Sequence, residues 1–225
     1  MPSSRPAAGS PTRPKAILFD WDNTLVESWP TIESALNSTF AAFGLRQWTS
    51  AEIKARVRRS LRESFPPLFG ERWEKAAAHY YDAFAAIHLK KLTPAAGARR
   101  MLEELAGSGI ALGVVSNKKG DVLRRESAHL GWDSYFGRVI GAQDAARDKP
   151  CVDVVDLALQ GSGITRGPDV WFVGDTEIDL ECAAAAGCVG VLLRDSKPGP
   201  DEFRAFPPDW HFHDCQALCK ALRSL

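Results

Sequence analysis

The stretch AILFDWDNTLVES, residues 16–28, decides the fold. Four apolar residues run directly into Asp20, and a second carboxylate follows at Asp22. Two carboxylates one residue apart at the end of a buried strand repel each other and destabilise the fold when nothing offsets their charge. We therefore expect a cation or a bound ligand at the point where this strand ends.

Further apolar runs along the chain resemble the first, and each is followed by a turn and then by a helical pattern. Continuous apolar strands that alternate with helices indicate an α/β fold, in which a Rossmann-like parallel sheet is covered on both faces. In such sheets the loops at the carboxyl ends of the strands build the functional site. The runs are IALGVVS from Ile110, RVIGA from Arg138, VWFVG from Val170 and VGVLL from Val189.

Residues 26–91 break this rhythm, because their apolar residues recur at helical spacing and they contain no convincing strand. Helices are predicted over TIESALNSTFAAFG, TSAEIKARVRRSL and GERWEKAAAHYYDAFAAIHLKKL. We interpret residues 26–91 as a small all-helical cap domain inserted after the first strand, and residues 15–25 with 92–225 as the catalytic core. Residues 1–14 are rich in Pro, Ser and Arg, which predicts a disordered tail.

Composition narrows the class of partner. The chain has 28 Lys plus Arg and 28 Asp plus Glu, and this neutral balance favours neither nucleic acid nor a charged membrane surface as the partner, so we expect a small molecule. No stretch approaches the roughly 20 apolar residues that span a bilayer, and the N-terminus has no apolar signal run. The five cysteines show no CxxC spacing. That argues against a disulfide framework, and we expect a cytoplasmic protein.

Carboxylates, hydroxyls and lysines follow the strands where the chain would leave the sheet. Three carboxylates favour a hard divalent cation such as Mg²⁺, which is usually shared with a substrate phosphate. A serine hydroxyl and a lysine would then hold phosphate oxygens. The groups are Asp20, Asp22, Asn23 and Thr24 after the first strand, Ser116, Asn117 and Lys118 after the second, Asp148, Lys149 and Pro150 after the third, and Gly174, Asp175 and Asp179 after the fourth.

The spacing of the first two carboxylates predicts a division of labour. Alternate residues of an extended strand share a face, so Asp20 and Asp22 can act on the same substrate. One carboxylate can attack phosphorus and form an aspartyl phosphate. The other can protonate the leaving oxygen and then activate water.

These residues resemble the haloacid dehalogenase-like superfamily of phosphohydrolases, whose four motifs occur in order as FDWDNT, VVSNK, DKP and VGDTEID. The resemblance extends from Lys15 to the C-terminus, and the helical insert is similar to the cap of the phosphoglycolate phosphatase-like branch. It implies a small phosphorylated metabolite as substrate. The implied catalytic residues are Asp20 as nucleophile, Asp22 as acid and base, and Ser116 and Lys149 as phosphoryl-binding groups; the implied metal ligands are Asp20, the Asp22 backbone carbonyl, Asp175 and, through water, Asp179.

Further substrate contacts are expected beside these groups. Thr24 and Asn117 stand next to catalytic positions, and the cap stretch RVRRSLRESFPPLFG offers Arg59 or Arg62 to the leaving group, although a basic run is more often a solvated helix face. Three places depart from the family pattern, one of them being Cys151, Val152 and Asp153, which follow DKP where a second proline is common. Asn23 replaces a usual glycine and is expected to keep a left-handed backbone, and the bulky Trp21 is expected to shape the mouth of the site.

Other functions compete with a phosphatase. A sugar phosphomutase of the same branch would use Asp22 in the same way, so the motifs do not separate the two. A dehalogenase needs neither a metal nor a leaving-group acid. Because Asp22 and the Asp175/Asp179 pair are both present, the sequence favours a phosphatase over a dehalogenase. A phosphoaspartate receiver module also groups aspartates, a hydroxyl and a lysine around Mg²⁺, but it carries adjacent acids after its first strand and its phosphoacceptor after its third.

Overall fold

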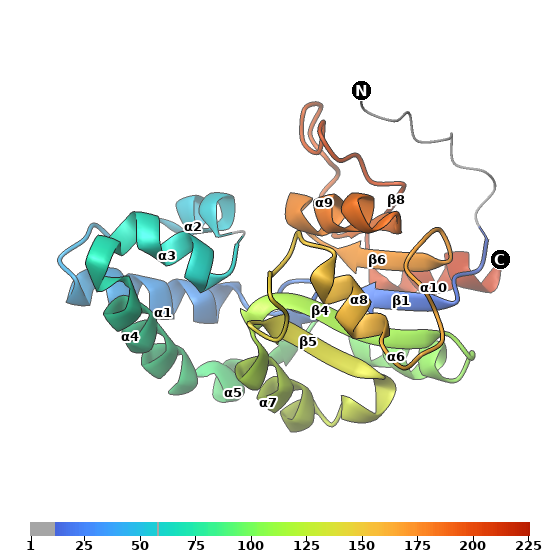
Figure 1. Cartoon of the computed structure of the whole chain (residues 1–225), viewed down its shortest axis with the longest axis horizontal. Helices are drawn as coiled ribbons and strands as arrows, with labels where there is room; N and C mark the ends of the chain where they lie inside the picture. Colours follow the sequence, from blue (N-terminus) through green and yellow to red (C-terminus); the bar gives the residue numbers. More distant parts are fainter. Residues whose placement is uncertain (1–11, 58) are drawn as a thin grey trace.

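A parallel sheet of six strands lies at the centre of the molecule (Figure 1). The computed structural model describes residues 12–57 and 59–225. Residues 1–11 of the predicted disordered tail, residues 1–14, therefore lie outside the described residues. The strand order is β5-β4-β1-β6-β7-β8, which confirms the predicted Rossmann-like α/β fold. The strands are β1 (Ala16–Phe19), β4 (Ala111–Lys119), β5 (Arg138–Ala142), β6 (Val170–Gly174), β7 (Val189–Leu193) and β8 (Trp210–Phe212).

Strand β1 is buried on both faces, between β4 and β6. Ile17 and Phe19 belong to one hydrophobic core, whereas Ala16 and Leu18 belong to the core on the opposite face. This alternation explains why the sequence shows a continuous apolar run and not a period of two. The helices that supply these cores are α6 (Ala98–Ala106), α7 (Gly120–Leu130) and α10 (Cys215–Arg223) on the first face, and α8 (Asp153–Leu159) and α9 (Glu177–Ala186) on the second.

A group of helices lies beside the carboxyl ends of the strands, at the left of Figure 1, and we call it the helical lobe. It encloses a core of its own, in which Phe40 stacks on Phe69 and Phe65 packs against Tyr80. The helices are α1 (Trp29–Ala42), α2 (Ser50–Arg56), α3 (Leu61–Phe69), the 3-10 turn η1 (Gly70–Arg72), α4 (Trp73–Ala85) and α5 (His88–Lys91). Within residues 12–57 and 59–225, no helix combines the length and apolarity that crossing a membrane requires.

Two local predictions for this segment were wrong. The last predicted helix, residues 70–92, is divided into η1, α4 and α5, and the break before α5 accompanies the burial of His88, which is 1% exposed. The segment also begins with a strand: β2 (Val26–Glu27) pairs antiparallel with β3 (Thr93–Pro94). Strands of two residues are too short to leave an alternating pattern in the sequence.

Candidate active site

The turn after β1 sets the direction of the first two carboxylates. Asn23 has a positive φ of 62°, which confirms the expected left-handed backbone at this position. Its side-chain Oδ1 accepts hydrogen bonds from the backbone N–H groups of Ser28 at 3.1 Å and Trp29 at 3.2 Å. A single residue therefore turns the chain out of the sheet and fixes the start of α1.

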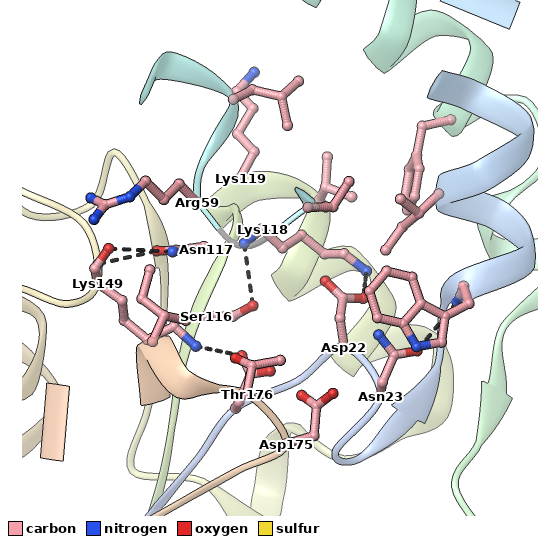
Figure 2. A pocket seen from close by; sticks show the side chains of 18 of the residues that line it. Asp22, Asn23, Arg59, Ser116, Asn117, Lys118, Lys119, Lys149, Asp175 and Thr176 are labelled. Atoms are coloured by element: carbon pink, nitrogen blue, oxygen red, sulfur yellow. Dashed lines mark hydrogen bonds and ion pairs between the residues drawn. The ribbon is translucent and has the colours of Figure 1, made fainter. Parts of the chain in front are cut away.

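Lys149 answers the charge problem that the sequence poses. Its Nζ lies 2.6 Å from Asp20 Oδ1 and 2.8 Å from Asp179 Oδ1, and all three side chains are buried. Asn117 holds the lysine loop: its Nδ2 donates to the backbone carbonyl of Lys149 at 3.3 Å, and its Oδ1 accepts from the Lys149 N–H at 3.1 Å (Figure 2). The ammonium group is thus fixed between a carboxylate that follows β1 and a carboxylate in the first turn of α9.

In this centre the single positive charge of Lys149 does not fully neutralise the neighbouring carboxylates. Burial raises the pKa of Asp20 to about 7, and the Asp179 charge acts in the same direction, while Lys149 opposes both. Burial disfavours the charged form of Lys149, but the Asp179 and Asp20 carboxylates outweigh burial and raise the pKa of the lysine. The lysine is therefore held charged, and it only partly offsets the burial of Asp20.

Three carboxylates form a group that can hold a metal ion. Oxygen atoms of Asp20, Asp175 and Asp179 all lie within 4.8 Å of one another. Together with Lys149 these groups carry a formal charge of −2 when ionised, and their donor atoms are all oxygens, which fits a hard divalent cation. Both oxygens of Asp179 already have protein partners: Thr176 donates its N–H and its hydroxyl to Oδ2, and Lys149 donates to Oδ1.

Gly174 makes this arrangement sterically feasible. A Cβ atom at position 174 would lie 2.3 Å from Cγ of Asp179, so any side chain there would displace the carboxylate. Thr24, predicted to contact substrate, is 2% exposed and donates its hydroxyl to Asp175 Oδ1 at 3.4 Å. The structure thus places Thr24 against the acidic cluster.

A cavity of about 110 Å³ opens above these groups, between the sheet and the helical lobe. The core contributes all of the predicted catalytic side chains, Asp20, Asp22, Ser116 and Lys149, together with Asp175. The lobe contributes mainly aromatic and aliphatic side chains and one predicted substrate-binding residue, Arg59. The lobe residues are Trp29, Ile32, Val57, Arg59, Leu61, Tyr80, Tyr81 and Phe84.

Two residues lie elsewhere than their sequence positions suggested. Arg62 is not among the residues that line the cavity; its guanidinium pairs with the Asp148 carboxylate. Trp21 was expected to shape the mouth of the site, and that expectation is wrong: its side chain is fully buried and its Nε1 donates to Glu126 Oε2 at 2.8 Å. The tryptophan packs edge-on against Trp132, which draws it into the core below the site.

Sequence reasoning missed a lysine–glutamate pair next to Asp22. Lys118 Nζ lies 2.6 Å from Asp22 Oδ1 (Figure 2). The same Nζ lies 2.6 Å from Glu126 Oε2. The signal for Lys118 was its place as the last residue of the second motif, VVSNK. The signal for Glu126 was weaker: on α7 it follows Leu123 by three residues, on the buried face where an apolar side chain is the usual occupant.

Comparisons with known proteins agree with this geometry. A family model described as haloacid dehalogenase-like hydrolase matches residues 17–192. Phosphoglycolate phosphatase 1 of Pseudomonas aeruginosa is 30% identical over 185 residues, 77% of this chain and 67% of that protein. The phosphoglycolate phosphatase of Xylella fastidiosa is 29% identical over 196 residues, 85% of this chain and 84% of that protein. A solved structure of a haloacid dehalogenase-like family protein from Streptococcus pneumoniae superposes with a TM-score of 0.80 at 23% identity, covering 92% of this chain and 97% of that one.

Proposed function

Because the chain belongs to the haloacid dehalogenase-like hydrolases, we propose that it is a Mg²⁺-dependent phosphatase that hydrolyses a small phosphate monoester through an aspartyl phosphate. The observation that carries the proposal is the position of the Lys149 ammonium group, which lies 2.6 Å from Asp20. Both residues line a cavity that Asp22 and Ser116 also line. This arrangement supports the proposal, because attack on phosphorus, proton transfer and phosphoryl binding all require suitable groups around one small space.

In the first step, Asp20 attacks the phosphorus atom. Oδ1 accepts the Lys149 hydrogen bond, so we assign the attack to Oδ2. A bond forms between Oδ2 and phosphorus, the bond from phosphorus to the leaving oxygen breaks, and Asp22 gives its proton to that oxygen. Lys149 and Ser116 bind the phosphoryl oxygens and offset the charge that develops on them.

In the second step, the Asp22 carboxylate accepts a proton from water as the water oxygen attacks phosphorus. The bond between phosphorus and Asp20 breaks and inorganic phosphate is released, which restores Asp20 as a carboxylate and Asp22 as the protonated acid. Mg²⁺ held by Asp20, Asp175 and the Asp22 backbone carbonyl, with Asp179 in support through water, would supply positive charge to the phosphate oxygens.

We also propose that residues 26–91 act as a cap on a core made of residues 15–25 and 92–225. Lobe side chains such as Tyr80, Tyr81 and Phe84 line the cavity opposite the catalytic carboxylates. A lobe closed in this way excludes water while the phosphoryl group is transferred to Asp20, so that water does not compete with Asp20 in the first step. Small metabolites such as phosphoglycolate are the first candidates, since two relatives carry that name.

The test is a panel of phosphate monoesters, including phosphoglycolate, sugar phosphates and nucleotides, assayed with Mg²⁺ or with EDTA. Wild-type protein is expected to release inorganic phosphate from at least one ester, and EDTA or Asp20→Asn is expected to abolish the release. Asp156→Asn is a suitable control because Asp156 pairs with Arg166 on the exposed surface, away from the cavity. A folded protein that releases no phosphate across the panel would contradict the proposal.

A further inference from the structure

A buried ion-pair network lies directly behind Asp22. Lys118 bridges two carboxylates, with Nζ 2.6 Å from Asp22 Oδ1 and 2.6 Å from Glu126 Oε2. The side chain of Lys118 is 7% exposed and that of Glu126 is 1% exposed, whereas Asp22, which reaches the cavity, is 19% exposed. The network therefore begins in the interior and ends on the proposed acid of the reaction.

Glu126 is anchored on every side by residues from other parts of the fold. Trp21, which lies between the two catalytic aspartates in sequence, donates its Nε1 to Oε2 at 2.8 Å. His88, from the segment that leads from the lobe back to the core, shares a hydrogen bond of 2.8 Å between its Nδ1 and Oε1. With Lys118 as the third partner, the glutamate cannot change its position without breaking contacts to the first strand and to the lobe.

Burying this ion-pair network has an unfavourable desolvation free energy. Burying charges costs several kcal/mol per ion, and a hydrophobic cluster of similar volume is often as stable or more stable. Burial disfavours the charged form of Lys118, but Asp22 and Glu126 outweigh burial and raise the pKa of the lysine, so Lys118 keeps its positive charge in the interior. A role at the site would explain why ions occupy this position.

We propose that Lys118 is a positioning residue for the phosphatase reaction: anchored by Glu126, it fixes the Asp22 carboxyl group so that the second oxygen, Oδ2, faces the leaving group. The inference rests on the proposed function, because it takes Asp22 as the acid. The geometry supports it directly. Lys118 holds Oδ1 from the interior side, and the Asp22 side chain lines the cavity.

The neighbouring lysine offers a matched control. Lys119 also lines the cavity, but its Nζ pairs with Asp121 at 3.3 Å on the exposed surface. Removing the charge of Lys119 therefore changes the cavity lining without touching Asp22 or Glu126. A non-specific effect of losing a cavity lysine would appear in Lys119→Met as well as in Lys118→Met.

The experiment compares two esters of similar shape, p-nitrophenyl phosphate and phenyl phosphate. The p-nitrophenolate ion leaves without a proton, whereas phenolate needs one, so only phenyl phosphate depends strongly on a well-placed acid. The measured quantity is kcat/KM, which covers the steps up to departure of the leaving group. Asp22→Asn calibrates the full loss of the acid.

Lys118→Met is expected to lower kcat/KM for phenyl phosphate by about 10- to 100-fold, since misplacing a catalytic group by about 1 Å costs that much. For p-nitrophenyl phosphate the loss of kcat/KM is expected to stay below about threefold, because departure of its leaving group depends little on the acid. The effect should fall on kcat and not on KM. Lys118→Arg should restore part of the activity, Glu126→Gln should show the same preference for the better leaving group, and Lys119→Met should show none.

A double variant completes the test. If Lys118 acts through Asp22, then Lys118→Met in the Asp22→Asn background lowers the rate no further than Asp22→Asn alone. Equal losses on both esters, a rise in KM with kcat unchanged, or an additional loss in the double variant would overturn the inference, with circular dichroism showing that each variant is folded. Should Lys118→Met not fold, Lys118→Arg and Glu126→Gln carry the same comparison. Where wild type hydrolyses only an ester of the earlier panel, the loss of kcat and the double-variant comparison are measured on that ester. A folded wild-type protein that releases no phosphate from any of these esters would instead overturn the proposed function, and the inference with it.

Discussion

Arg62 of α3 forms a two-point ion pair with Asp148, the residue that immediately precedes Lys149. The Asp148 side chain is 0% exposed and also accepts the Gln143 backbone N–H at 2.9 Å, whereas the arginine is 30% exposed. This pair connects the helical lobe directly to the loop that carries Lys149. Opening of the lobe would break the pair and expose Asp148 to water.

The pair predicts that Arg62 contributes to closure more than to stability. Arg62→Ala is expected to lower kcat/KM by about tenfold, because a planar two-point contact is worth about 1.5–3 kcal/mol in the closed form and is lost to water in the open form. Arg46→Ala, which removes the exposed Arg46–Glu52 pair of the same lobe, serves as the control. Small-angle scattering should show a larger radius of gyration for Arg62→Ala only. An unchanged rate and radius would contradict this role.

The pKa of Asp20 predicts how the metal-free protein responds to pH. Its folded value is raised from 3.8 to about 7, chiefly by burial, so the folded state binds more protons than the unfolded state between these two values. Stability is therefore lost as the pH rises from about 4 to about 7. Asn does not ionise, and Lys149 keeps its Asp179 partner. We expect Asp20→Asn in EDTA to be more stable than wild type by about 1–3 kcal/mol above pH 7, and the difference to vanish near pH 4.

Thermal melts across this pH range measure that difference. For a chain of this length each kcal/mol corresponds to about 2–4 °C in Tm. Asp156→Asn, at an exposed ion pair, should follow the wild-type curve. A constant offset between Asp20→Asn and wild type at all pH values would show that the burial of the Asp20 charge is not the cause.

The acidic cluster predicts a stability gain from Mg²⁺. An ion that binds only the folded state stabilises it by about 2.7 kcal/mol at a concentration 100 times its Kd. Wild type is therefore expected to melt at higher temperature as Mg²⁺ is added, whereas Asp175→Asn, which removes one of the three clustered carboxylates, should show little response. Calorimetric titration measures the binding directly. An equal thermal response in both proteins would place the ion elsewhere.

Gly174 predicts a steric effect on the catalytic centre. Gly174→Ala would bring Cβ within 2.3 Å of Asp179 Cγ, so the carboxylate must move away from Lys149. We expect a loss of about 1–3 kcal/mol in stability, typical of overpacking, together with a large loss of phosphatase activity. Gly107→Ala is the control, because the nearest atom there is 3.6 Å away and its backbone is helical. Similar melting temperatures for the two variants would argue that the loop adjusts.

The sequence predicted the sheet and the edge at which the polar strand-end residues meet because both rest on local signals. Apolar runs mark β1 and β6, and polar residues at their carboxyl ends, such as Asp20 and Asp175, must meet at one edge of a parallel sheet. The partners of these residues were not predictable in the same way. Trp21 and Glu126 are 105 residues apart, and no local pattern indicates that an indole between two aspartates points into the core toward α7.

Arg62 shows the same limit from the other direction. A basic run on a predicted helix does not say which arginine faces the cavity and which one meets a buried carboxylate, because that depends on how the lobe sits on the sheet. The structure distributes the two candidates: Arg59 lines the cavity, and Arg62 reaches Asp148. The fold can thus be predicted from the strands and the residues at their ends. Contacts between the lobe and the sheet cannot, because they depend on how distant segments pack together.

The pairing of β2 with β3 has an evolutionary consequence. Because Val26 and Pro94 are register partners, the chain departs from the sheet and returns to it at neighbouring points. A segment with adjoining ends can be exchanged for another of different length or shape while the sheet and its catalytic loops keep their places. If the lobe acts as the proposed cap, replacement of this module would change the substrate range, and grafting a foreign lobe between these two short strands is a direct way to test that.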